Sequence, residues 1–214
     1  MTSTQQLSFG AVDSLLTRRP WTPPHLADFA QATVQAYDQA LANTGMVIIK
    51  ANAAGIHLLA ASMIRPPADV QAIASTEGNY ARADNLLAGV LRSRKGYAAA
   101  ADAVVYERPP VAGRRTESIG LAGREIHRAT QGAAVMVDNR HAKKLLVGRA
   151  GTKRDPVTKA HVKEAVERYV TPPAQSGKDM PWNEHIRDAV MLAMAYLLDR
   201  KQAEIRAEQL AATA

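Results

Sequence analysis

The segment YDQALANTGMVII, residues 37–49, decides the fold that we predict for this chain. It joins a short extended run, Ala32 to Tyr37, which is followed by Asp38, to a β-rich run, Gly45 to Lys50. A third run, Gly55 to Ile64, follows after a link of hairpin length. Because both links are too short for crossover connections, we expect three consecutive antiparallel strands.

Beyond residue 64, helical patterns alternate with short buried strands. The strands are predicted over Asp102 to Glu107 and Ala133 to Asp138, and a helix precedes each of them. Strands that are joined through helices can lie parallel to one another. We therefore predict an α/β fold, in which a mixed five-stranded sheet is antiparallel over its first three strands, then parallel, with helices on both faces. The predicted helices are Gly78 to Arg94, Thr116 to Gln131, Arg140 to Val147, Thr158 to Val170 and Glu184 to about Ala211.

The composition limits the classes of protein that the chain can belong to. Its 214 residues are 47% hydrophobic, which is enough to build one buried core. We divide the chain into an N-terminal extension (1–31), a folded domain (32–200) and a helix end or tail (201–214). Because there is no Cys, a metal site would use Asp, Glu or His. No run reaches the roughly 18 apolar residues of a membrane span, and the polar start is unlike a secretory signal. We expect a soluble, cytoplasmic protein.

Positive charge is concentrated in one part of the chain. Arg108 to Val170 contains 14 Lys and Arg against 6 Asp and Glu, whereas the rest contains 13 against 14. The basic stretch therefore accounts for the whole net charge of +7. Such a stretch suits a polyanion such as nucleic acid, and a solvated basic face explains the composition alone equally well.

Three acidic residues and a histidine lie near the ends of predicted elements. Asp38 closes the first strand, Glu107 closes the fourth, and Asp188 lies one turn after His185 near the start of the last helix. An acid at the end of an apolar strand is costly unless it is compensated, and Mg²⁺, which prefers oxygen ligands, would compensate it. Carboxylates that converge from two strands and a helix can hold two ions roughly 3.5–4 Å apart. Taken singly, each residue is more often a turn former or a surface charge, and Asp188 also suits a helix dipole.

The sequence around these acids resembles that of a known family. An apolar residue, Asp38, a Leu and the Thr44-Gly45 pair lead into the second strand, as in the RuvC-type Holliday junction resolvases of the RNase H-like nuclease superfamily. Val105-Tyr106-Glu107 resembles the family's second metal carboxylate at the end of strand four. The run His185-Ile-Arg-Asp188 resembles the start of its last helix, where two metal-side residues lie three apart.

The resemblance extends from about Thr33 to Leu198, with three departures, of which the first is an extension before Asp38 that is long for this family. The Gly- and Ala-rich segment Thr116 to Arg128 and the basic segment His141 to Val162 are similar to family segments in the same order. However, Arg108-Pro109-Pro110-Val111 follows Glu107 where members often carry an aromatic wedge, and the basic loop from Gly148 to Pro156 is longer than usual. These differences suggest a divergent branch of chromosomal or phage origin.

The resemblance implies an RNase H-like nuclease domain over residues 32–200. Such a domain would form a homodimer and cut branched DNA, a four-way junction, by paired nicks that leave 5′-phosphates. It would use two Mg²⁺ ions, for which Mn²⁺ can substitute, held by Asp38, Glu107, His185 and Asp188, with Asp38 bridging both. Lys143 or Lys144, and Lys159, would lie near the scissile phosphate. The residues expected to bind DNA are Arg108, Arg114, Arg115, Lys144, Arg149, Lys153 and Arg154.

Three alternatives remain open from the sequence. The chain could be another RNase H-like nuclease that acts on flaps or RNA–DNA hybrids, because its sheet and carboxylates would look alike. It could be a structure-specific DNA-binding protein that has lost catalysis. It could also be an α/β protein whose acids are surface charges. The apolar stripe of the helix from Gly78 to Arg94 fits either a core or a dimer interface.

Overall fold

A computed structural model describes residues 21–74, 76–95, 101–109, 116–174, 177 and 180–213. The predicted residues Arg114 and Arg115, and residues 1–20 of the predicted extension, lie outside this part of the chain. The described elements are the 3₁₀ helix η1 (Leu26–Asp28), the strands β1 (Thr33–Asp38), β2 (Thr44–Asn52), β3 (Gly55–Ile64), β4 (Ala103–Glu107) and β5 (Val135–Val137), and the helices α1 (Ala68–Ala72), α2 (Thr76–Lys95), α3 (Thr116–Ala129), α4 (Asn139–Val147), α5 (Lys159–Glu167) and α6 (Glu184–Thr213).

The predicted mixed sheet is confirmed, in the order β3-β2-β1-β4-β5. The β1–β2 and β2–β3 pairs are antiparallel, whereas β1–β4 and β4–β5 are parallel. Strand β5, at one side of the sheet, is shorter than predicted, and its residues Val135 and Met136 are exposed. The short helix α1, which follows Pro66-Pro67, was not predicted.

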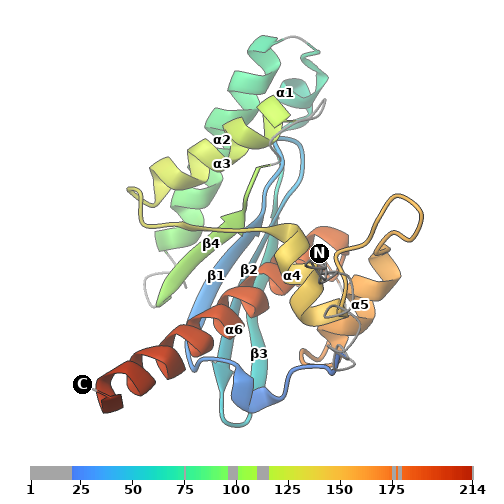
Figure 1. The fold of residues 1–214 in the computed structure, drawn as a ribbon. Coiled ribbons are helices and arrows are strands. Elements are labelled where there is room, and N and C mark those ends of the chain that lie inside the picture. The colour runs from blue at the N-terminus through green and yellow to red at the C-terminus, as the bar shows by residue number, and fades with distance from the viewer. Residues whose placement is uncertain are drawn as a thin grey trace, which may run out of the picture.

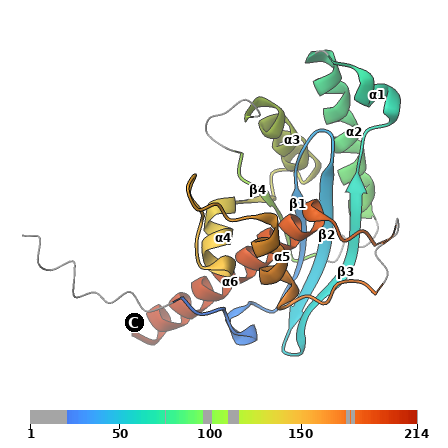
Figure 2. The ribbon, with the colours of Figure 1, turned by 90° about the vertical axis from the view of Figure 1, so that its right-hand side faces the viewer.

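Helices cover both faces of the sheet and form two cores. On one face α6 runs across the strands beside α4 and α5, and its C-terminal turns extend beyond the sheet (Figure 1). On the opposite face α2 packs against the strands (Figure 2), together with α3. Leu86 and Val90 of α2 are buried in this second core, so these members of the predicted apolar stripe belong to the core.

The alternation of side chains along β1 fixes the face on which its last residue lies. Val34 and Ala36 belong to the core under α6, whereas Tyr37 belongs to the core under α2. Because side chains alternate between the faces of a strand, Asp38 lies on the α6 side. By the same alternation, Val105 under α6 places Glu107 on that side as well.

The described part of the predicted extension packs against the helices of the α6 face. The indole Nε1 of Trp21 donates to the carbonyl of Leu145 at 3.3 Å, and the Tyr169 hydroxyl donates to the carbonyl of Pro24 at 2.7 Å. Phe29 is buried, with its ring 5.2 Å from that of Tyr169 in an edge-to-face contact. Phe29 and Ala30 of this stretch thus belong to the core. Among the described helices, none combines the length and the hydropathy that crossing a bilayer requires.

Candidate active site

Asp38 and Glu107 end two adjacent parallel strands. Tyr37 pairs with Tyr106 in the β1–β4 register, so the two acids occupy the next position on each strand, on the same face of the sheet. At the other side of β1, Asp38 pairs with Gly45 at the start of β2. The turn between these strands is closed by Thr44, whose hydroxyl donates to the carbonyl of Ala40 at 2.6 Å and accepts from its N–H at 3.1 Å.

Helix α6 brings His185 and Asp188 to the end of the sheet at which β1 and β4 finish. The imidazole Nδ1 of His185 lies 2.8 Å from Oδ2 of Asp38. This approach depends on Gly45, because a Cβ at that position would lie 2.5 Å from the carbonyl oxygen of His185. The Thr44-Gly45 pair therefore has a physical role at the site: Thr44 closes the turn, and Gly45 lets α6 approach the strand that carries Asp38.

Two amide side chains that were not predicted as site residues hold Glu107. Gln39, which is buried, donates from Nε2 to the backbone carbonyl of Glu107 and accepts from its N–H at 2.8 Å. Asn139, the first residue of α4, donates from Nδ2 to the carboxylate Oε1 at 3.0 Å. Their sequence positions, directly after Asp38 and after β5, were the available clue, but their partners depend on the folded structure.

The charges at this edge act strongly on one another. Burial and the charge of Asp38 raise the pKa of Glu107 to about 7 and that of Asp188 to about 6. The hydrogen bond with Asp38 raises the pKa of His185. The positive charge of Lys143 opposes the rise of the pKa for both Glu107 and Asp188. Perturbed carboxyl groups gathered at one place are typical of functional sites.

The chemistry of this cluster fits a hard divalent cation. Three carboxylates and one imidazole supply the oxygen and nitrogen ligands that Mg²⁺ and Mn²⁺ accept, and a cation would relieve the mutual repulsion of the acids. As they stand, no three His, Asp or Glu side chains in the described residues are arranged to hold one ion. Asp38 bonds His185 through Oδ2 and Glu107 bonds Asn139 through Oε1, so one oxygen of each carboxylate is already engaged.

The two predicted catalytic lysines occupy different surroundings. Lys143, on α4, is partly buried, and its charge acts on both Glu107 and Asp188. Lys159, the first residue of α5, is exposed and forms an ion pair with Glu184, the residue before His185. Lys144 lies instead in a groove of about 750 Å³ with Trp21 and the outer half of α6. Of the two neighbouring lysines, the structure thus favours Lys143 at the carboxylates.

The other predicted DNA-binding residues that are described are spread over two places. Arg108 is exposed directly after Glu107, and its backbone N–H donates to the carbonyl of Val137 at 2.8 Å. In the basic loop, Arg149 forms an ion pair with Asp155, and Lys153 and Arg154 are exposed. Only Arg108 directly adjoins a candidate site residue in the chain, and the loop residues remain predictions.

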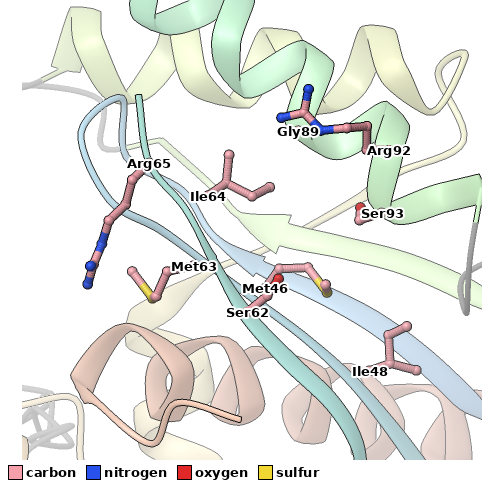
Figure 3. Close-up of a pocket in the computed structure, with 9 residues that line it drawn as sticks. All are labelled: Met46, Ile48, Ser62, Met63, Ile64, Arg65, Gly89, Arg92 and Ser93. Atoms are coloured by element: carbon pink, nitrogen blue, oxygen red, sulfur yellow. The ribbon is translucent and has the colours of Figure 1, made fainter. Parts of the chain in front are cut away.

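A separate cavity on the α2 face is not the candidate site. It has a volume of about 420 Å³ and lies between α2 and the strands β2 and β3. The two arginines that line it, Arg65 and Arg92, lie well apart and do not converge on one point (Figure 3). Neither the carboxylates nor His185 line this cavity.

Comparison with known proteins identifies the fold. No family model and no curated protein matches the chain. Among solved structures, RuvC of Thermus thermophilus in complex with a Holliday junction substrate has a TM-score of 0.61 at 17% identity, with 80% of this chain and 96% of that chain covered. A second T. thermophilus RuvC structure has a TM-score of 0.60 at 16% identity over the same shares. The yeast mitochondrial Holliday junction resolvase Ydc2 has a TM-score of 0.52 at 11% identity, covering 85% of this chain and 84% of that chain. The chain therefore has a RuvC-type resolvase fold.

Proposed function

We propose that this protein is a metal-dependent endonuclease that resolves four-way DNA junctions. The observation that carries the proposal is the convergence of Asp38, Glu107, Asp188 and His185 from β1, β4 and α6 at one edge of the sheet. This cluster lies in a fold shared with two resolvases, one of which was solved with a Holliday junction substrate. The basic stretch from Arg108 to Val170 supplies positive charge for a nucleic acid.

In this proposal the four side chains hold two Mg²⁺ ions, or Mn²⁺ in their place. When bound, the ions would supply an activated water and stabilise the leaving 3′ oxygen, which yields a 5′-phosphate. Asp38, which bonds His185 and whose charge acts on both other acids, is the residue best placed to contact both ions. Lys143 offsets the negative charge that gathers on the scissile phosphate.

The remaining contacts with DNA are assigned by charge. Lys159, Arg108 and the loop residues Arg149, Lys153 and Arg154 would bind flanking phosphates, together with Lys144, Arg114 and Arg115. Contacts of this kind set the affinity and its salt dependence and carry no base specificity. A homodimer would place two such sites about one two-fold axis, which matches the symmetry of a four-way junction.

The test is cleavage of labelled four-way junctions, flaps and RNA–DNA hybrids of equal length, with and without Mg²⁺. We expect paired nicks in the junction only when Mg²⁺ is present. Preferential cutting of hybrids or flaps would refute the four-way junction as the substrate but would leave the proposed metal-dependent cleavage in place. If no substrate is cut, calorimetry detects no divalent cation binding and a gel shift still shows junction binding, the protein is a DNA-binding protein without catalytic activity.

A further inference from the structure

Of the two polar atoms in the Asn139 side-chain amide, only the nitrogen has a hydrogen-bond partner among the described residues. Its Nδ2 donates to the Glu107 carboxylate at 3.0 Å. Its Oδ1 is buried from solvent and has no hydrogen-bond donor among the described residues. Buried carbonyl oxygens almost always have a partner, so an orphaned one indicates a missing water, ion or ligand. Here the orphaned oxygen belongs to a side chain that touches a candidate metal ligand.

The electrostatics of the cluster favour a neutral oxygen at this position. Asp38, Glu107 and Asp188 already repel one another, and a fourth carboxylate would add to that repulsion. An amide adds an oxygen without adding negative charge, and amide oxygens are accepted by hard cations. The same amide supplies an N–H that orients Glu107, which a carboxylate could not do in its ionised form.

We propose that Asn139 is part of the cation site, with Nδ2 positioning Glu107 and Oδ1 binding the divalent cation, either directly or by accepting a hydrogen bond from a water that the cation retains. This inference rests on the proposed metal-dependent function and adds a residue to it. Residues that orient metal ligands typically change metal affinity by about 10–100-fold when they are replaced.

The experiment measures Mn²⁺ binding to the DNA-free protein by electron paramagnetic resonance. We expect Asn139→Ala to bind Mn²⁺ about 10–100-fold more weakly than the wild type. Asn79→Ala is the matched control, because Asn79 is also partly buried and bonded, to Arg82 on α2, away from the carboxylates. Thermal melts of both variants would establish that they are folded.

Two further measurements separate an oxygen donor from a tether that only holds Glu107. Asn139→Asp keeps an oxygen but loses the N–H. If the Asn139 oxygen binds the cation, Asn139→Asp should bind Mn²⁺ more tightly than Asn139→Ala. If Asn139 only holds Glu107 in place, Asn139→Asp should bind Mn²⁺ more weakly than Asn139→Ala. Because an added charge also attracts cations, the decisive measurement is ¹³C coupling to bound Mn²⁺ in protein labelled at the asparagine side-chain carbonyl. We expect coupling in the wild type that is absent from Asn139→Ala.

The outcomes distinguish this inference from the proposed function. Equal Mn²⁺ affinity of Asn139→Ala and the wild type, or no ¹³C coupling in the wild type, would overturn the role of Asn139 while leaving a metal-dependent nuclease intact. If the wild-type protein binds no Mn²⁺ and cuts no junction, the proposed function fails and this inference fails with it.

Discussion

Two groups of polar side chains flank β1, one on each face of the sheet, and they are stabilised differently. The α2-face group consists of Gln35, Tyr37 and Ser93. Both of the first two side chains contact Ser93 Oγ: the Tyr37 hydroxyl lies 2.9 Å from it, and Gln35 Nε2 donates a hydrogen bond to it at 3.3 Å. The α6-face group consists of Asp38, Glu107 and Asp188, which are like charges.

The difference indicates which group is structural and which is functional. Neutral side chains that hydrogen-bond one another cost less to bury than charged ones, although Gln35 Oε1 has no hydrogen-bond partner among the described residues. The charge of Asp38 helps to raise the pKa of Glu107 and of Asp188, so holding these two groups ionised destabilises the folded protein at neutral pH. A protein retains such an arrangement where it serves a function, so the α6-face group should govern activity and the α2-face group should govern stability alone.

The largest expected effect is that of Asp38→Asn on cleavage. The substitution removes the central charge of the α6-face group, and metal contacts contribute several kcal/mol to transition-state stabilisation, so we expect a loss of about 10³-fold in cleavage rate. Junction binding should persist, because phosphate contacts with basic residues dominate affinity. Cleavage assays and gel shifts on the same junction measure the two effects. If this variant cuts the junction at the wild-type rate, the α6-face group does not govern activity.

The second effect is a loss of stability with rising pH when cations are absent. Glu107, whose pKa rises from 4.5 to about 7, binds its proton more tightly in the folded state than in the unfolded chain. The free energy of unfolding should therefore fall between these pH values, by roughly 3 kcal/mol for a shift of this size. The raised pKa of His185 acts in the same direction, because its extra folded-state proton is lost at higher pH.

Urea unfolding at pH 5 and pH 8, in EDTA and in Mg²⁺, measures this fall. We expect the protein to be less stable at pH 8 in EDTA, and we expect Mg²⁺ to restore much of the difference because it binds the folded state. Asp38→Asn should reduce the fall by removing one source of repulsion. A pH-independent stability in EDTA would mean that the carboxylates do not interact as the structure indicates.

The third effect comes from Gly45→Ala, which pushes α6 away from Asp38. The new methyl group would lie 2.5 Å from the His185 carbonyl oxygen, so the backbone must shift. We expect about a 10²-fold loss of cleavage, as for a misplacement of about 1 Å, and a destabilisation of about 1–3 kcal/mol. Gly120→Ala on α3 is the control, because a Cβ there meets nothing within 4 Å. That control should be neutral or slightly stabilising. Equal activity of the two variants would contradict the role of Gly45.

The elements that the sequence predicts well are those set by local patterns. The antiparallel strands follow from β-rich runs and short links, and alternation along β1 and β4 places Asp38 and Glu107 on one face. The convergence of His185 and Asp188 with these strands was a hypothesis from their positions near the ends of predicted elements, and the resemblance to a family supported it. The register that aligns Tyr37 with Tyr106, and so brings the two acids side by side, pairs segments far apart in the chain and comes from the folded structure.

Other parts of the site depend on contacts between distant segments. Gln39 spans 68 positions to bond the backbone of Glu107, and Asn139 reaches it from α4. Neither pairing follows from residue type or spacing, because an amide serves equally well on a surface. The choice of Lys143 over Lys144 likewise depended on how α4 packs beside α6.

The smallest effect is that of Tyr37→Phe, which tests the structural side of the comparison. The substitution removes the hydroxyl that lies 2.9 Å from Ser93 Oγ, while Ser93 still donates to the carbonyl of Val90 at 2.8 Å. We expect a loss of about 1 kcal/mol in the free energy of unfolding, as for one hydrogen bond, and unchanged cleavage and metal binding. Denaturant unfolding and junction cleavage measure the two. A loss of cleavage in a stable Tyr37→Phe variant would show that the α2-face group is coupled to the carboxylates through β1, because Tyr37 and Asp38 are adjacent on that strand.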